Sequence, residues 1–135
     1  MAEKHPFIEL QELVDEYKNN RLSFDAKQLQ DLRERISLCY FYLSDSVSKA
    51  VSNYDAADYE RKRNYAELIE QHKYGEDGSR NTVAVTESLA RIDNKEKEEA
   101  VVEALRQKER VRIIMSATTQ ILNSISSRLN SISQK

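Results

Sequence analysis

The chain has 135 residues, of which 39 % are hydrophobic and 33 % charged, and its formal net charge at pH 7 is −2. The hydrophobic share is below the average of globular domains and the charged share is above it, which favours elongated helices with narrow apolar seams over a rounded domain with a thick core. One cysteine excludes an internal disulfide, and two histidines with one cysteine exclude a zinc-binding set. We therefore expect no metal and no other cofactor.

Glycine and proline, the usual interrupters of helices, occur at only two places in the chain. Proline is found only at position 6, and glycine only at positions 75 and 78. This pattern predicts an all-α fold: a long antiparallel helical hairpin, coiled-coil-like and oligomeric, preceded by a short helix. We expect one domain over 1–135, with the short helix at about 6–20, long helices at about 24–73 and 82–133, and a turn at 74–81.

The expected helices follow apolar spacing and capping residues. Ser23 is a suitable N-cap for the second helix, and Asn81 or Thr82 for the third. The third helix begins with an apolar series at Val85, Leu89 and Ile92 and then carries a solvated charge run at 93–99. Pairing of the two long helices about residue 77 places Tyr54 opposite Val101 and Leu43 opposite Ile113.

Nothing in the sequence indicates export or membrane insertion. The segment 1–6 lacks the apolar core of a signal peptide, and no run approaches the roughly eighteen apolar residues of a membrane span. We expect a cytoplasmic protein, in the host cytoplasm if a phage encodes it, with no membrane partner. The charges are uneven, because residues 105–135 hold six bases and one acid whereas residues 1–20 hold five acids and two bases. Such asymmetry suits contacts between subunits or an anionic partner.

Basic and aromatic residues gather near the expected turn, a combination that suits single-stranded nucleic acid. Lysine and arginine neutralise phosphates, while tyrosine rings stack on unpaired bases. Interspersed acids leave a second interpretation open, in which the cluster is a solvated helix surface held by ion pairs one turn apart. The candidate nucleic-acid-binding residues are Tyr59, Arg61, Lys62, Arg63, Tyr65, Lys73 and Arg80.

Two further segments are candidates for function. A secondary basic patch at 106–112 either faces an anionic ligand or pairs with the acidic first helix or the region of Asp45. An apolar stripe at 121–132, flanked by serine and asparagine, is expected to form the oligomer interface, or else to cover the first helix and residues 29–36. The patch comprises Arg106, Lys108, Arg110 and Arg112, and the stripe comprises Ile121, Leu122, Ile125, Leu129 and Ile132.

No catalytic motif is present, because the two histidines are far apart in sequence and the glycine pair lacks the lysine and threonine of a phosphate loop. We therefore expect a protein that is not an enzyme. Its size, the stretch 59–65, the polar turn and the segment 121–128 resemble the small helical recombination mediators of T4-type bacteriophages. The resemblance covers roughly residues 24–130.

The resemblance implies a ring-forming homo-oligomer that binds single-stranded DNA and helps a RecA-like recombinase displace single-strand-binding protein. By position, it implies phosphate contacts at Arg61, Lys62, Arg63 and Lys73, and ring formation through residues 121–132. Two main hypotheses follow, and a helical subunit of a larger enzyme is a third class. One is an accessory of phage DNA recombination or replication. The alternative is a coiled-coil protein-interaction module: a scaffold, a virion component or an inhibitor of a host protein. The charged segment 93–99 and the acidic first helix favour this alternative.

Overall fold

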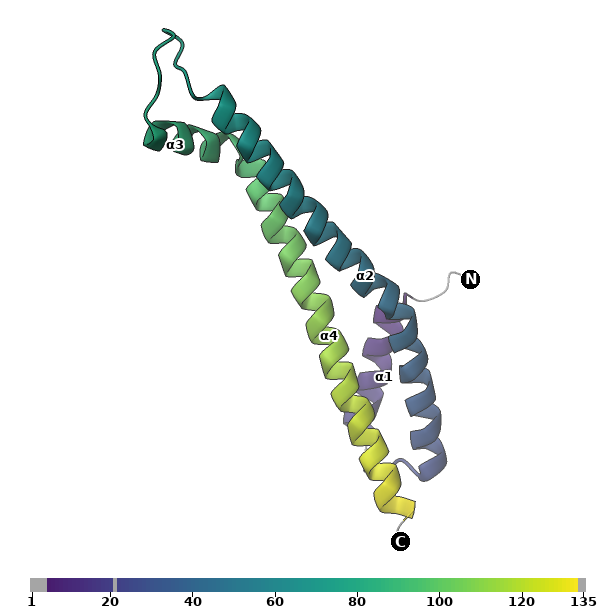
Figure 1. The fold of residues 1–135 in the computed structure, drawn as a ribbon. Coiled ribbons are helices and arrows are strands. Elements are labelled where there is room, and N and C mark those ends of the chain that lie inside the picture. The colour runs from purple at the N-terminus through teal and green to yellow at the C-terminus, as the bar shows by residue number, and fades with distance from the viewer. Residues whose placement is uncertain (1–4, 21, 134–135) are drawn as a thin grey trace. The chain divides into compact units, whose positions relative to one another are not determined.

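The structure, a computed structural model, describes residues 5–20 and 22–133, and it is built from α-helices. Within these residues the helices are α1 (Pro6–Asn20), α2 (Ala26–Gln71), α3 (Val83–Asp93) and α4 (Lys95–Ser133), as Figure 1 shows. The only β-structure among them is one isolated antiparallel bridge between Tyr74 and Arg80. The predicted all-α class is therefore confirmed. Residues 1–4, which form most of the segment considered for export, lie outside the described residues.

The described residues divide into two compact units. The first unit takes its described residues from Met1–Ser48 and Arg110–Lys135, and the second is Lys49–Glu109. Both long helices contribute to both units, since α2 spans residues 26–71 and α4 spans residues 95–133. Each unit therefore has its own packing, and we describe each by itself.

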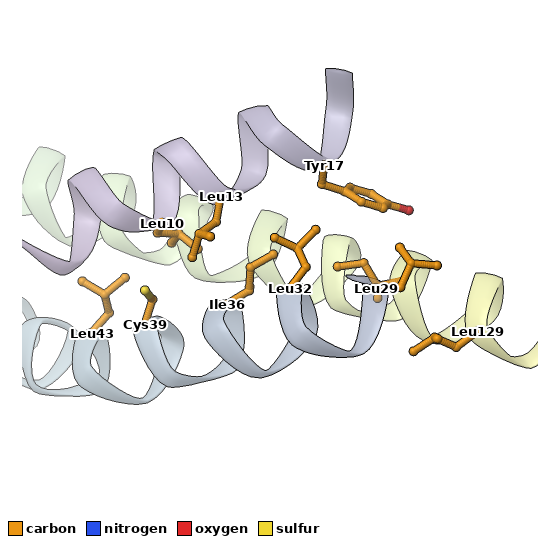
Figure 2. Packing of buried hydrophobic residues seen from close by; sticks show 10 residues of the cluster. Leu10, Leu13, Tyr17, Leu29, Leu32, Ile36, Cys39, Leu43 and Leu129 are labelled. Carbon is orange, nitrogen blue, oxygen red and sulfur yellow. The ribbon is translucent and has the colours of Figure 1, made fainter. Parts of the chain in front are cut away.

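The first unit packs α1, the beginning of α2 and the end of α4 around one apolar core (Figure 2). Leu29, Ile36, Leu43 and Ile125 are completely buried in it. Most of the α2 residues that enter this core recur every three or four positions, which keeps them on one helix face. The buried core residues are Leu10, Leu13, Tyr17, Leu29, Leu32, Ile36, Cys39, Leu43, Ile125 and Leu129.

Helix α2 begins two residues later than expected, with a different cap. The Oδ1 atom of Asp25 accepts a hydrogen bond from the backbone N–H of Gln28 at 2.7 Å, and Gln28 Oε1 accepts one from the N–H of Asp25 at 2.9 Å. This reciprocal pair is a capping box. Ser23 is therefore not the cap. Its hydroxyl instead donates to the carbonyl of Asn20, the last residue of α1, at 2.9 Å.

The apolar stripe at the end of α4 lies in the core of the first unit. Ile125 is completely buried and Leu129 nearly so. Ile121 and Leu122 pack against the same cluster, whereas the side chain of Ile132 is exposed. The hydroxyl of Tyr17 also forms a 2.6 Å hydrogen bond with the hydroxyl of Ser124. The stripe therefore covers α1 and the start of α2, the alternative left open above, and most of it is not available to another copy.

The second long helix is interrupted, contrary to the prediction of one helix over 82–133. Helix α3 ends at Asp93 and α4 starts at Lys95, with Asn94 between them. The backbone N–H of Asn94 still bonds to the carbonyl of Ala90, and its carbonyl accepts the N–H of Glu98. Asn94 has φ −90° and ψ 4°, which turns the chain out of the helical path.

The break also reverses which face of α3 is buried. Thr86, Ala90 and Asn94 are buried, whereas the predicted seam residues Val85, Leu89 and Ile92 are exposed. The Asn94 amide explains this, because its hydrogen bonds to α2 fix the end of α3 with the face that includes Asn94 turned inward. The charge run 93–99 thus contains one of the most completely buried side chains in the described chain.

The pairing of α2 with α4 is shifted from the expected register. In the second unit the ammonium of Lys108 lies 4.6 Å from the ring centroid of Tyr54, which had been expected opposite Val101. In the first unit Ile113 is exposed, and its neighbour Ile114 is the residue that packs against the core with Leu43. A simple hairpin count fails here because α3 forms a separate helix beside the turn.

Candidate nucleic-acid interface

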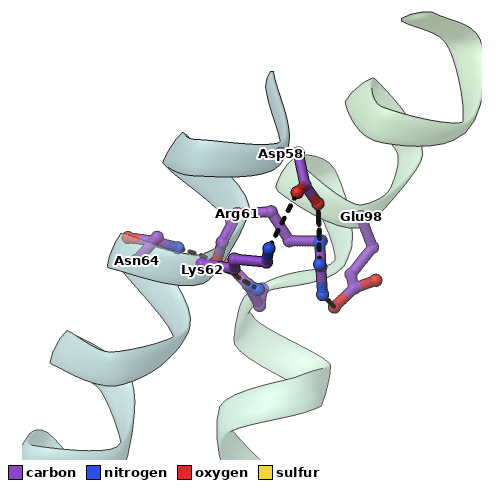
Figure 3. A network of polar contacts seen from close by, with 6 residues as sticks. Asp58, Arg61, Lys62, Asn64 and Glu98 are labelled. Atoms are coloured by element: carbon purple, nitrogen blue, oxygen red, sulfur yellow. Dashed lines mark hydrogen bonds and ion pairs between the residues drawn. The ribbon is translucent and has the colours of Figure 1, made fainter. Parts of the chain in front are cut away.

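All seven residues predicted to contact nucleic acid belong to the second unit, and α2 divides its share of them between two faces. Arg61 is directed toward α4: its side chain is 29 % exposed, against 67 % for Lys62. Its guanidinium lies 2.7 Å from a carboxylate oxygen of Asp58 and 4.0 Å from one of Glu98 on α4 (Figure 3). Arg61 is therefore mainly a structural link between two helices.

Arg61 also contributes its backbone to a buried polar contact. The side-chain N–H of Asn94 donates to the carbonyl of Arg61 at 3.2 Å, and Asn94 Oδ1 accepts from Asn64 Nδ2 at 2.7 Å. Tyr65, on the same side of the helix as Arg61, is half-buried. The predicted phosphate contact at Arg61 and the predicted stacking surface at Tyr65 are thus both largely occupied by packing within the second unit.

The remaining α2 candidates form an exposed surface that we call the outer α2 face, comprising Tyr59, Lys62 and Arg63. Lys62 and Arg63 follow Tyr59 by three and four residues, so the three side chains share one side of the helix. All three side chains are exposed. A tyrosine ring beside two cations is the combination that binds an unpaired base and the phosphates next to it.

Each cation of this region has a carboxylate partner one helical turn away. Lys62 lies 3.0 Å from Asp58, and Arg63 lies 2.8 Å from Glu60 and 3.7 Å from Glu67. With Arg61, three cations thus lie beside four carboxylates, and the cluster has no excess of positive charge. The contacts within the chain thus match the second interpretation, in which the cluster is a solvated helix surface held by ion pairs one turn apart.

The ion pairs keep these groups charged. Hydrogen bonds from Arg61 and Lys62 lower the pKa of Asp58, and a hydrogen bond from Arg63 lowers the pKa of Glu60. The same bonds raise the pKa values of Arg61 and Arg63. Because water screens exposed ion pairs and each contributes little to stability, a phosphate can replace a carboxylate beside Lys62 or Arg63 at little cost.

The turn between α2 and α3 presents a second exposed tyrosine and arginine. Tyr74 and Arg80 face each other across the antiparallel bridge, and both are exposed. The N–H of Gly75 donates to the carbonyl of Ser79 at 2.8 Å, and that of Asn81 to the carbonyl of Lys73 at 2.8 Å. These bonds close the loop and hold the backbone of Tyr74 opposite that of Arg80.

Two details make the loop tight. Gly78 has φ 80°, in the left-handed region that favours glycine. Asp77 Oδ1 accepts hydrogen bonds from the backbone N–H and the hydroxyl of Ser79, which lowers the pKa of Asp77. Asn81 Nδ2 also donates to the carbonyl of His72 at 2.8 Å, which ties the loop to the end of α2.

The secondary basic patch does not act as one group. Arg106 pairs with Glu103 at 3.0 Å, and Lys108 lies over the ring of Tyr54, both within the second unit. Arg110 and Arg112 belong to the first unit and are exposed. The four bases are therefore divided between the units, and we assign them no common site.

Three residues that no sequence pattern singled out form the helix contact beneath the outer α2 face: Asn64, Asn94 and Glu98. One signal was available: Asn94 is the only uncharged residue in the run 93–99 and has a low helix propensity. In the part of the chain that the structure describes, no group of three His, Cys, Asp or Glu side chains is placed to hold a metal ion. None of the described helices is both long and apolar enough to cross a bilayer.

Comparisons of the chain with models of protein families, with curated proteins and with solved structures find no match.

Proposed function

We propose that this chain is a non-enzymatic accessory protein of DNA recombination or replication that binds single-stranded DNA through its second unit and assists the loading of a RecA-like recombinase. The observation that carries the proposal is the outer α2 face, where Tyr59 stands with Lys62 and Arg63 on one exposed side of a helix. The exposed pair Tyr74 and Arg80 on the following loop adds a second element of the same chemistry.

The mechanism combines weak contacts of two kinds. Stacking of one base on a tyrosine contributes about 1–3 kcal/mol, and each phosphate bound by a lysine or arginine releases counterions from the strand. The carboxylates of Asp58, Glu60 and Glu67 compete for the same cations, so one chain offers a modest site. An assembly of several copies on one strand raises the affinity through effective concentration.

The experiment is a titration of fluorescent oligo-dT with the protein, followed by fluorescence anisotropy at several salt concentrations. The variant pair K62E and R63E, combined in one chain, is expected to weaken binding by about tenfold or more and to flatten the salt dependence. The matched control is K95E with R106E, which changes the net charge equally at two exposed positions of α4.

Two results decide against the proposal. Absence of oligo-dT binding by the wild-type protein at low salt removes the function itself. If K62E/R63E and the control weaken oligo-dT binding equally, the effect comes from net charge alone, and the outer α2 face is not the interface.

A second candidate function, a protein-interaction module without nucleic-acid binding, is favoured by one observation on α3. Val85, Leu89 and Ile92 are spaced four and three residues apart and are all exposed, which forms an apolar stripe on an otherwise polar surface. Capture of a stoichiometric partner protein that is lost on Leu89→Glu, together with silence in the oligo-dT titration, would establish this function instead.

A further inference from the structure

Helix α2 carries a second apolar group in the first unit, on the side opposite the core. Leu38, Phe41 and Tyr42 are 54 %, 69 % and 57 % exposed, whereas the adjacent Cys39 and Leu43 point into the core in Figure 2. The rings of Phe41 and Tyr42 contact each other edge to face, with centroids 5.9 Å apart. Three large apolar side chains on less than two turns of one helix form an exposed patch of the kind that marks a protein contact.

The charges beside this patch are arranged symmetrically about its centre. Arg35 precedes Leu38 by three residues, and Asp45 follows Tyr42 by three residues; both charged side chains are exposed. The series Arg35, Leu38, Tyr42, Asp45 has spacings of three, four and three, the alternation of a coiled-coil seam. Its midpoint falls at position 40.

We propose that this face of α2, defined by Arg35, Leu38, Tyr42 and Asp45, binds the same face of a second copy of the chain in antiparallel orientation. A two-fold axis at position 40 places Leu38 of each copy opposite Tyr42 of the other, and Arg35 of each copy opposite Asp45 of the other. Such an interface is self-complementary, because every contact occurs twice. Phe41 of each copy extends the apolar area beside the central layers.

The same residues exclude the parallel arrangement. A parallel pair in register would place Arg35 against Arg35 and Asp45 against Asp45, and like charges that face each other across an interface disfavour that arrangement. The order of charges along the helix therefore selects the antiparallel dimer. The inference does not depend on DNA binding, and it assigns self-association to α2, since the α4 stripe 121–132 is mostly committed to the core of the first unit.

The test measures the mass of the full chain in solution by sedimentation equilibrium over a range of concentrations. The wild type is expected to associate to twice 15.7 kDa. Arg35→Asp alone and Asp45→Arg alone are each expected to weaken association by about tenfold or more, because each places two like-charged pairs in the interface. Lys18→Asp, at an exposed position of α1, is the matched control and should leave the dimer unchanged.

The decisive arm mixes the two single variants in equal amounts. In a mixed pair every reversed side chain meets an opposite charge, so the mixture is expected to dimerise as the wild type does. Positions 35 and 45 are about 15 Å apart along the helix axis, so this recovery can come only from a second chain. All three substitutions lie at exposed positions, and an unchanged helical circular dichroism spectrum shows that the variants are folded.

Three outcomes overturn the proposal: a wild-type chain that remains at 15.7 kDa throughout, single variants that associate as the wild type does, or a mixture that does not recover the dimer.

Discussion

Asn64 and Asn94 bind each other through their side-chain amides, with Nδ2 of Asn64 donating to Oδ1 of Asn94 at 2.7 Å. Asn64 lies on α2 and Asn94 lies between α3 and α4 in the second unit, and Asn94 is completely buried. Its amide also bonds to the carbonyl of Arg61 at 3.2 Å. A single buried side chain thus fixes the junction of α3 and α4 against α2, beneath the outer α2 face.

We expect Asn94→Ala to reduce the free energy of unfolding by about 1–3 kcal/mol, because it leaves the Asn64 amide and the Arg61 carbonyl without these partners. The measurement is urea denaturation followed by circular dichroism. Asn64→Ala should cost less, and the double variant should cost less than the sum of the two. Asn123→Ala, at an exposed position of α4, is the control. Additive effects of the two substitutions would show that the amides do not interact.

The hydrogen bond between Tyr17 and Ser124 gives a second prediction, for the first unit. Tyr17→Phe keeps the buried ring but loses a 2.6 Å bond between α1 and α4, so it should lower the free energy of unfolding by about 0.5–1.5 kcal/mol. Tyr59→Phe removes the same hydroxyl at an exposed position and should change nothing measurable. Equal effects of the two substitutions in urea denaturation would contradict the contact.

Stability should depend on acid through the ion pairs of Asp58 and Glu60. The folded-state pKa values of both carboxyls are lowered by hydrogen bonds from Arg61, Lys62 and Arg63. A lowered folded-state pKa stabilises the folded chain above the ordinary value of about 4, and this stabilisation is lost as the pH falls through the folded-state value. The difference in thermal midpoint between wild type and Asp58→Asn should therefore shrink below about pH 4. A difference that stays constant down to about pH 2 would show that Asp58 is not stabilised as a carboxylate.

The thiol of Cys39 should be unreactive in the folded chain. Cys39 is buried in the core of the first unit, and this burial, with the nearby charge of Glu9, raises the pKa of the thiol. The raised pKa keeps the reactive thiolate scarce, and the burial keeps the sulfur inaccessible to reagents. Reaction with a chromogenic disulfide reagent should be slower than in concentrated urea by on the order of a hundredfold or more. Similar rates in the two conditions would place Cys39 outside a stable core.

Much of the fold follows from the sequence because helices obey local rules. The confinement of glycine to positions 75 and 78 marked the turn, and Pro6 marked the start of α1. The interruption at Asn94 did not follow, because it depends on hydrogen bonds to Arg61 and Asn64, thirty or more residues away in the chain. Apolar spacing alone also assigned the wrong face of α3 to the core.

The sequence predicted which residues make up the candidate site, and the structure shows which of them are exposed. The sequence located the basic and aromatic residues, but it does not show which of them point toward α4. The structure separates Arg61 and Tyr65, which pack, from Tyr59, Lys62 and Arg63, which face outward. The 121–132 stripe was ambiguous for the same reason: a segment that covers its own chain and one that covers another copy have the same apolar spacing.

The most direct test of the central proposal is photocrosslinking of the wild-type protein to oligo-dT that contains iodouracil, with the crosslinked residues identified by mass spectrometry. Iodouracil reacts with aromatic rings on which it stacks, so crosslinks are expected at Tyr59 and Tyr74. The K62E/R63E chain serves as the control, in which the crosslink at Tyr59 should weaken. Crosslinks confined to the first unit, or none at low salt, would contradict the account.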